Sequence, residues 1–399
     1  MRHISSSFYA GFARVALLAL TVLVAGCSGS LEALGAPTAT STATATATPT
    51  PIPSATPTPT PSPTPTPTWQ RTQTLIPPTG RQFQAGWLSP DGAYLALLSQ
   101  PDTAPGEEWD YDPMLHIMDA NTMQPVWVGK PETRRPFQWA EYVTWVPNSP
   151  YLLLEGTAST YMMLALIRVT DGEVLWQRSW PHEGFGLRYS AYDVRTQTLL
   201  VRARSGEYLQ AYKVPAMEPV ARYMAAETRQ GCCLLHDIYG DDEHLVALGW
   251  ERYGGRYHLI VWDTDDPAGR TLRLPYNWND TSLTNLVWGP QDEIATLLVP
   301  ATGSSSDVYT FLFIDPTTGN VRWSMTERET FSVAATWLDG HGWLIADFNG
   351  GVRLYTQPER YETLRVPTPS DMVYSLTSTW DGSRWLLVLG SQAELWAWR

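Results

Sequence analysis

Residues 85–98 read AGWLSPDGAYLALL, and this stretch decides the fold because the chain repeats its pattern. An aromatic residue is followed by a tight polar turn and then by an apolar strand. The pattern recurs around Trp87, Trp145, Tyr192, Tyr239, Trp288, Trp337 and Trp380. The anchors are spaced by about 49 residues, and a period of that length indicates one supersecondary unit per copy.

Each copy continues as four short strands. MLHIMDA at 114–120 is an example of a third strand, and NVRW at 320–323 of a fourth. Pro, Asp, Asn and Gly occupy the turns, where they supply preset or positive φ angles. Four strands in about 40–50 residues is typical of a β-propeller blade, and helical periodicity is absent. The sequence therefore predicts an all-β, seven-bladed β-propeller over residues 69–399.

Two turn motifs carry a resemblance to known families. SPDG before YLALL, at 89–98, resembles the WD40-like repeats of bacterial propellers. IDPTTGNVRW at 314–323 resembles the repeat of pyrroloquinoline-quinone-type propellers, and VTDGEVLW at 169–176 is a shorter copy. The resemblance implies that the Asp and Thr-Gly build the turn between the third and fourth strands, and that the Trp packs between blades. A shared fold implies little about chemistry.

The stretch QRTQTLIPP at 70–78 reads as a strand with no partner beside it. The last copy ends at Arg399, one strand short of a complete blade. We therefore predict that the first strand completes the last blade, which closes the ring and removes an exposed edge. This pairing places the start of the propeller at about residue 69.

The beginning of the chain has the features of an export signal. Arg2 and Arg14 precede the apolar run 15–25, which is shorter than the roughly 20 residues that a membrane-spanning helix needs. VAGC at 24–27 resembles the bacterial lipobox, and this resemblance implies a signal peptide over 1–26 and lipidation of Cys27. The alternative is an ordinary secreted protein that is released.

Residues 27–68 are predicted to be a disordered linker. The part from 36 to 68 is rich in Thr and Pro and has no charged residue. Such a segment cannot bury enough apolar surface to fold, and its prolines favour an extended stalk. We therefore expect an extracytoplasmic lipoprotein that is attached to a bacterial membrane only through its lipid, on the cell surface or the periplasmic side.

The amino-acid composition argues against some classes of partner. The chain has 27 basic and 40 acidic residues, a net charge of −13, which argues against nucleic acid as a partner. We expect a monomer without a cofactor. The chain has three cysteines. Cys232 and Cys233 are interpreted as two buried thiols at the start of a strand, because Cα atoms of consecutive residues, about 3.8 Å apart, are closer than disulfides usually allow. The alternative is a vicinal disulfide against a quinone cofactor.

The binding face is predicted from the loops. The turns between strands a and b and between c and d lie on one face of a propeller, while the longer, irregular b–c and d–a loops lie on the other, where binding usually occurs. In those loops two arginines are candidates to clamp a carboxylate or phosphate, and aromatic and polar residues are candidates to hold a sugar or peptide. The candidates are Arg134, Arg135, Trp250, Arg252, Tyr276, Trp278, Asn279 and Asp280. The alternative is that they are surface arginines and aromatics packed on neighbouring loops.

Metal and catalytic sites are not evident. Asp110 and Asp112, in the insertion 100–113, are weak candidates for a calcium site, but the spacing matches no EF-hand loop, which favours a solvated acidic loop. The histidines are scattered without metal-ligand spacing. The sequence thus predicts a module that binds or scaffolds a protein, peptide or glycan. The alternative is a propeller enzyme, either a lactonase-like hydrolase or a quinone-dependent dehydrogenase.

Overall fold

The computed structural model describes residues 68–102, 112–134, 137, 139–158, 161–181, 188–225, 233–251, 254–262, 268–277, 281–289, 293–300, 310–326, 332–357, 360–368 and 371–399. Every regular element in these ranges is a β-strand. None of the described residues forms a helix that is long and apolar enough to span a bilayer.

The first fourteen strands are β1 (Trp69–Leu75), β2 (Arg81–Leu88), β3 (Tyr94–Pro101), β4 (Met114–Asp119), β5 (Pro125–Gly129), β6 (Trp139–Val146), β7 (Tyr151–Ala158), β8 (Tyr161–Arg168), β9 (Val174–Pro181), β10 (Ser190–Asp193), β11 (Thr198–Arg202), β12 (Tyr208–Lys213), β13 (Glu218–Ala225) and β14 (Leu234–Gly240). The other fourteen are β15 (Leu245–Trp250), β16 (Arg256–Trp262), β17 (Ala268–Asn277), β18 (Thr281–Gly289), β19 (Glu293–Pro300), β20 (Thr310–Ile314), β21 (Val321–Thr326), β22 (Ser332–Leu338), β23 (Gly342–Asp347), β24 (Val352–Gln357), β25 (Arg360–Arg365), β26 (Val373–Ser378), β27 (Arg384–Leu389) and β28 (Ala393–Trp398).

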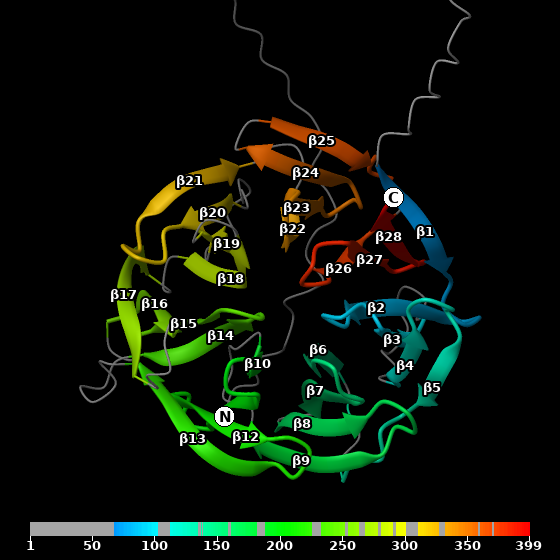
Figure 1. The fold of residues 1–399 in the computed structure, drawn as a ribbon, viewed down its shortest axis with the longest axis horizontal. Coiled ribbons are helices and arrows are strands. Elements are labelled where there is room, and N and C mark those ends of the chain that lie inside the picture. The colour runs from blue at the N-terminus through cyan, green and yellow to red at the C-terminus, as the bar shows by residue number, and fades with distance from the viewer. Residues whose placement is uncertain are drawn as a thin grey trace, which may run out of the picture. The chain divides into compact units, whose positions relative to one another are not determined.

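These strands form antiparallel sheets arranged around a common axis (Figure 1). Five sheets have four strands, and one has eight. In the eight-stranded sheet, two antiparallel groups of four are joined where β13 and β17 pair in parallel, Met224 with Ala268 and Ala225 with Gly269. The innermost strands β2, β6, β10, β14, β18, β22 and β26 contact one another in that order, and β26 contacts β2. The chain is therefore an all-β propeller with four-stranded blades, as the sequence predicts.

The ring is closed by the two ends of the folded chain. Strand β1 pairs antiparallel with β28, from Trp69 opposite Trp398 to Leu75 opposite Ala393. The backbone of Thr68 and that of Arg399 exchange two hydrogen bonds, with N···O distances of 2.7 and 3.1 Å. The prediction that the first strand completes the last blade is confirmed.

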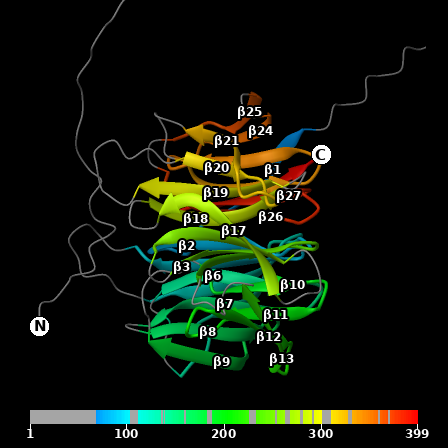
Figure 2. The same cartoon turned by 90° about the vertical axis from the view of Figure 1, so that its left-hand side faces the viewer.

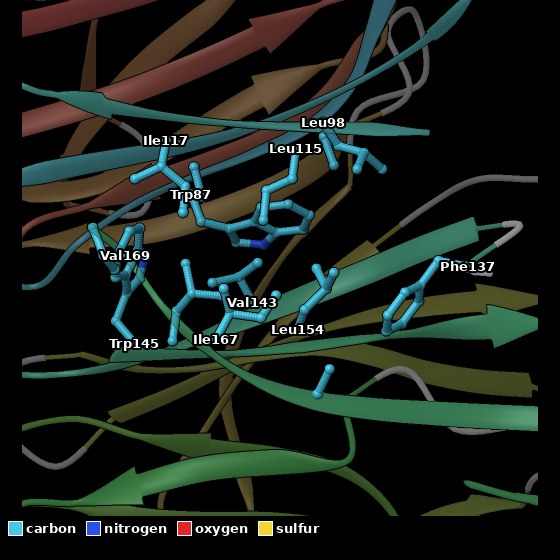
Figure 3. Packing of buried hydrophobic residues seen from close by; sticks show 14 of the residues in the cluster. Trp87, Leu98, Leu115, Ile117, Phe137, Val143, Trp145, Leu154, Ile167 and Val169 are labelled. Carbon is cyan, nitrogen blue, oxygen red and sulfur yellow. The ribbon is translucent and has the colours of Figure 1, made fainter. Parts of the chain in front are cut away.

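Seven hydrophobic clusters within the described residues hold the ring together, and each combines side chains from two neighbouring blades. Between the sheets β2–β5 and β6–β9, Trp87 and Leu115 pack with Trp145 and Val143 (Figure 3). Because both faces of a blade are covered in this way, its middle strands are apolar on both sides, as β8 and β27 show. The core of the molecule thus consists of the interfaces between blades.

The c–d turns have the construction that the family resemblance implies. The carboxylate of Asp315 accepts hydrogen bonds from the backbone N–H groups of Thr317 (2.7 Å) and Thr318 (3.2 Å), and these bonds lower the pKa of Asp315. Gly319 follows with a φ of 74°, a left-handed conformation that favours glycine. Trp127 fills the space beside Gly172 of the next blade, which leaves no room for a side chain at that glycine.

The two faces of the ring can be assigned from hydrogen bonds. The backbone N–H of Trp398, at the end of β28, donates to Ser383 in the turn between β26 and β27. Arg384 donates to Asn121 in the turn between β4 and β5. Both termini of the folded part and the a–b and c–d turns therefore share one face, with the C-terminus beside β1 (Figure 2). The b–c and d–a loops lie on the opposite face.

Most inner strands carry a β-bulge near the same place in their length, a feature that the sequence did not reveal. The register shifts at Gln84 in β2, Glu141 in β6, His236 in β14 and Tyr374 in β26, and also in β18 and β22. The extra residue in a bulge is unpaired in the ladder, which redirects its side chain, and bulges often occur beside functional sites.

One of the seven repeat anchors is wrong. Trp380 follows the end of β26 at Ser378, in the turn, where its N–H donates to Pro90. The strand position that aromatic residues hold in the other copies belongs to Thr377, whose hydroxyl accepts from the N–H of Leu88 on β2. Trp380 fitted the repeat pattern because it is an aromatic residue beside a polar turn, but it lies three residues after the true anchor position.

Candidate functional site

Ionisable side chains converge on the inner strands of the ring, and Arg188 is the centre of this group. Arg188 precedes Tyr189 and the short strand β10, four residues before Tyr192. Glu141, at the bulge of β6, lies the same four residues before Trp145. Although charged, it is only 8% exposed. A buried guanidinium needs partners, and the neighbouring strands supply them.

Arg188 forms a bidentate ion pair with Asp237 of β14. Nε lies 2.5 Å from Oδ1, and Nη2 lies 2.9 Å from Oδ2. Nη2 also donates to the carbonyl of Leu286 on β18, and the N–H of Leu286 donates to Asp237 at 2.9 Å. Two side chains thereby connect three successive inner strands.

Two tyrosines flank the same guanidinium. Its carbon lies 5.4 Å from the ring centroid of Tyr142 on β6 and 5.8 Å from that of Tyr239 on β14, within the range of cation–π attraction. Burial opposes the charge, but Asp237 and Tyr142 more than compensate and raise the pKa of Arg188. Arg188 is therefore charged at every pH at which the protein folds.

A second polar group lies between β7 and β10. The carboxyl of Glu155, on β7, accepts hydrogen bonds from the N–H of Tyr189 (2.7 Å) and from the hydroxyl of Ser190. The hydroxyl of Ser190 in turn lies 2.7 Å from that of Thr144 on β6. Burial raises the pKa of Glu155 to about 7, and burial likewise raises that of nearby Glu141 to about 7.

Most polar groups of this site form their hydrogen bonds with one another or with the backbone. The guanidinium of Arg188 and the carboxylate of Asp237 use their hydrogen-bonding capacity on each other and on the backbone. Glu141 differs, because it retains contact with solvent on the bulge of β6. Among the residues that the structure describes, no group of three or more His, Cys, Asp or Glu is placed to hold a metal ion.

The described members of the predicted binding face fall into two places. Arg134 is exposed in the loop after β5, and its backbone N–H donates to Gln177 of β9 at 3.1 Å. Trp250, at the end of β15, and Tyr276, near the end of β17, pack against the same hydrophobic cluster. Trp250 also contacts the ring of His236 edge-on at 5.0 Å, and burial raises the pKa of Tyr276. The structure thus places Trp250 and Tyr276 on strands of one sheet, against one hydrophobic cluster, and Arg134 on another blade.

Several predicted positions lie outside the described residues. They are Cys27, Asp110, Arg135, Cys232, Arg252, Trp278, Asn279 and Asp280, together with residues 1–67 of the signal and linker.

Asp112, a weak calcium candidate, is engaged by cations of the protein itself. Its carboxylate pairs with Lys130, and it lies 3.7 Å from Arg81. Arg81 also donates to the backbone carbonyl of Asp112 at 2.5 Å. Two positive side chains therefore oppose the binding of a further cation at this carboxylate.

The interpretation of Cys233 as a free thiol is wrong. Cys233 is fully buried just before β14, and it is disulfide-bonded. Its backbone φ is 49°, in the left-handed region. The objection from usual Cα spacing did not consider an unusual backbone conformation at this residue.

Sequence reasoning missed two buried histidine contacts on the face of the b–c loops. His116 on β4 lies with Nε2 2.8 Å from the hydroxyl of Ser99, which also accepts from Arg81 at 2.9 Å. His258 on β16 lies with Nε2 3.0 Å from Glu251. Ser99 is completely buried, so this serine and histidine stabilise the blade and are not positioned to attack a substrate. Pairs of this kind leave no sequence motif, because their members come from neighbouring segments that meet only when the sheet forms.

Comparison with known proteins supports the fold. No family model matches the sequence, and no curated protein matches it. Many solved structures match the fold. One is the crystal structure of the C-terminal WD40 domain of Sif2, at 13% sequence identity and a TM-score of 0.52, covering 81% of this chain and 83% of that chain. At this identity the likeness concerns the fold alone, so the chain has a WD40-like β-propeller fold.

Proposed function

We propose that this chain is a bacterial, membrane-anchored extracytoplasmic lipoprotein whose seven-bladed propeller binds a protein, a peptide or a glycan. Seven blades agree with the closed order of the inner strands and with the seven hydrophobic clusters between neighbouring sheets. WD40-like propellers commonly serve as protein-binding scaffolds. The signal, lipobox and stalk are inferred from the sequence of residues 1–68.

One observation carries the proposal: Thr68, the residue at which the proposed stalk would end, lies on one face, and the irregular loops lie on the other. Thr68 joins the fold beside Arg399, on the face of the a–b and c–d turns. A stalk attached there leaves the opposite face free for a partner. This geometry is what a displayed binding module requires.

The free face also carries exposed apolar side chains on the last two blades. They are Ile76, Phe348, Val366 and Met372, and Val366 is the most exposed at 73%. The segments that carry Phe348, Val366 and Met372 are connected, because Val373 donates to the carbonyl of Phe348 at 3.1 Å and Thr368 donates to that of Asn349 at 3.0 Å. Ile76 lies on the same face, just after the end of β1. We call these four residues the apolar patch. Exposed apolar residues gathered on one face favour protein contact.

The disulfide at Cys233 supports the proposed location of the protein outside the cytoplasm. Disulfides form and persist in oxidising environments and are rare in the cytosol. A disulfide at a fully buried cysteine therefore agrees with export across the membrane.

The alternative of a propeller enzyme rests on the ionisable residues near the axis. A hydrolase would need an acid, a base and a stabilising cation that converge on substrate. Arg188, Asp237 and Glu155 do converge, but they are buried and bonded to one another or to the backbone. We therefore favour binding over catalysis.

The binding proposal can be tested by site-specific photo-crosslinking in the native host. A photoreactive residue at Val366 or Met372 should yield a discrete crosslinked product, whereas the same residue at Asn121 or Asp381, in turns of the opposite face, should not. The variant Val366→Glu should abolish the product formed from position 372. Equal yields from both faces, or products that survive Val366→Glu, would contradict the proposed face. Trp250→Ala and Tyr276→Ala would show whether these two aromatic residues, on a different blade from the apolar patch, also contact the partner.

The anchor is tested separately. Cys27→Ala should release the full chain from the membrane fraction, while a matched change near the lipobox, Ser28→Ala, should leave it bound. A Cys27→Ala protein that remains in the membrane fraction would refute lipidation at this position.

A further inference from the structure

Two glutamates of this protein are completely buried, and their surroundings are opposite. Glu155 on β7 and Glu394 on β28 both have an exposure of 0%. Taking a carboxylate out of water is costly unless a positive group compensates the charge. The neighbours of each residue therefore decide which form, charged or neutral, the folded protein holds.

Glu394 is surrounded by donors and cations. Arg71 and Arg365 both lie 3.2 Å from its oxygens, and Gln392 and Trp396 donate to it at 2.6 and 3.2 Å. Two guanidinium groups and two neutral donors satisfy an ionised carboxylate. Glu394 is thus built into the fold as an anion.

Glu155 has no such compensation among the described residues. No Lys, Arg or His nitrogen forms an ion pair with it, and its two hydrogen bonds come from the N–H of Tyr189 and the hydroxyl of Ser190. Arg188, whose charge acts on Glu155, makes its bidentate contact with Asp237 instead. A buried carboxyl in this setting is most stable with a proton.

Burial is the largest influence on Glu155, and the groups around it act in both directions. On β6, Glu141 adds a like charge when it is ionised. On β8, the residue paired with Glu155 is the apolar Leu164. Ahead of β10, the guanidinium carbon of Arg202 on β11 lies 4.3 Å from the centroid of the Tyr189 ring. The hydrogen bonds from Ser190 and Tyr189 and the charge of Arg188 favour the charged form of Glu155, but burial outweighs them and raises its pKa to about 7.

The hydroxyls beside Glu155 can accept its proton in a hydrogen bond. A neutral Glu155 donates to Ser190, Ser190 donates to Thr144 at 2.7 Å, and Thr144 donates to the carbonyl of Ser190 at 3.3 Å. Every member of this chain then has a partner. When Glu155 loses its proton, the chain must reverse, and an uncompensated negative charge remains between β7 and β10.

We propose that Glu155 is a proton-dependent contact between two blades, which holds β7, β6 and β10 together while protonated and weakens that junction when it ionises. The consequence is a propeller whose stability falls as the medium turns from mildly acidic to mildly alkaline. The sign follows from linkage: a carboxyl that binds its proton more tightly in the folded than in the unfolded state stabilises the fold less as pH rises between the two pKa values, here from about 4.5 to about 7.

The test uses the full chain and compares Glu155→Gln with Glu394→Gln. Gln has the shape of a protonated Glu and can keep both contacts at position 155. We expect Glu155→Gln to reduce clearly the Tm loss that the wild type shows between pH 5 and pH 8, and Glu394→Gln to lower Tm at both pH values without flattening the slope. Glu141→Gln serves as the control for the neighbouring carboxyl and should leave much of the slope in place.

A second readout does not depend on stability. Because Glu141 has a similarly raised pKa, its band is removed first by recording infrared difference spectra of Glu141→Gln between pH 5.5 and pH 8.5. A buried carboxylic-acid C=O band should titrate near neutrality in Glu141→Gln and disappear in the double variant Glu141→Gln/Glu155→Gln. An unchanged Tm slope in Glu155→Gln, or a band that survives in the double variant, would overturn the proposal. If Glu155→Gln does not fold, the absence of a titrating band in Glu141→Gln would overturn it equally.

Discussion

Arg71 and Glu394 are separated by 323 positions in the sequence, yet Nη1 of Arg71 lies 3.2 Å from Oε1 of Glu394. The first strand of the fold thereby contributes a charge to a carboxylate buried in the last. Arg365, from the neighbouring blade, binds the same carboxylate. One buried anion thus connects the beginning of the fold, its end and the adjacent blade.

The two arginines should differ in importance. The side chain of Arg71 is 51% exposed and that of Arg365 is 12% exposed. We expect Arg71→Ala to lower the free energy of unfolding by up to about 1 kcal/mol, as for a solvent-exposed pair. Arg365→Ala should cost roughly 3–5 kcal/mol because it leaves a buried charge undercompensated. Urea denaturation of both variants checks the order, and equal losses would contradict it.

Closure by β1 should be essential for stability. Trp69 is buried against His341, Trp385 and Trp398, so Trp69→Ala should cost roughly 3–5 kcal/mol. A chain that begins at residue 80 should lose more, because β28 then becomes an exposed edge. A truncated protein with an unchanged Tm would show that the pairing adds nothing.

The ion pair between Arg188 and Asp237 should be strongly coupled. Arg188→Met or Asp237→Asn alone should cost roughly 3–5 kcal/mol, since each leaves a buried charge without its partner. The double variant should cost clearly less than the sum of the two. A double-mutant cycle measures this difference, and simple additivity would mean that the pair is not formed.

Gly172 should tolerate alanine less well than Gly80. Both have a positive φ, 71° and 76°, so each Gly→Ala change should cost about 1–2 kcal/mol in backbone strain. A Cβ at Gly172 would also lie 2.1 Å from Trp127, whereas nothing lies within 4 Å of one at Gly80. Gly172→Ala should therefore cost about 1–3 kcal/mol more. Thermal unfolding of the two variants tests this, and an equal loss would place Trp127 elsewhere.

His116 should make the fold less stable in acid. Burial and the nearby Arg81 lower the pKa of His116 below its ordinary value of 6.5. As pH falls below about 6.5, the unfolded chain takes up a proton that the folded chain does not, so stability falls, in the direction opposite to Glu155. His116→Gln can still accept from Ser99 and should flatten the loss of Tm between pH 7 and pH 5. An equally steep loss in the variant would exclude His116 as its source.

The architecture could be predicted from the sequence because each blade is formed largely by one continuous stretch of the chain. Short strands, polar turns and a regular aromatic anchor lie within each copy, and the unpaired first strand had one free partner in the last. The anchor at Trp380 was wrong for a local reason too. Trp380 lies in the turn, and the strand position that an aromatic residue holds in the other copies is occupied by Thr377.

The ionisable contacts near the axis could not be read in the same way. Arg188, Asp237 and Glu155 lie in different copies, and nothing in their local sequence distinguishes them from surface residues. Their roles arise from ring closure and from bulges that shift a strand by one position. The aromatic residues Trp250 and Tyr276 are conspicuous in the sequence, and their role in binding stays a prediction.

The pairing of β1 with β28 also has a consequence for how the protein is made. Synthesis proceeds from the N-terminus, so Trp69 emerges long before Trp398, its partner in the ladder. Contacts of such long range form late and slow folding. Until the last strands have been synthesised, β1 has no partner and the final sheet is incomplete. The nascent chain therefore carries an unpaired strand for most of its synthesis. A partner that covers β1 during that interval would raise the yield of native protein without contributing to its final stability.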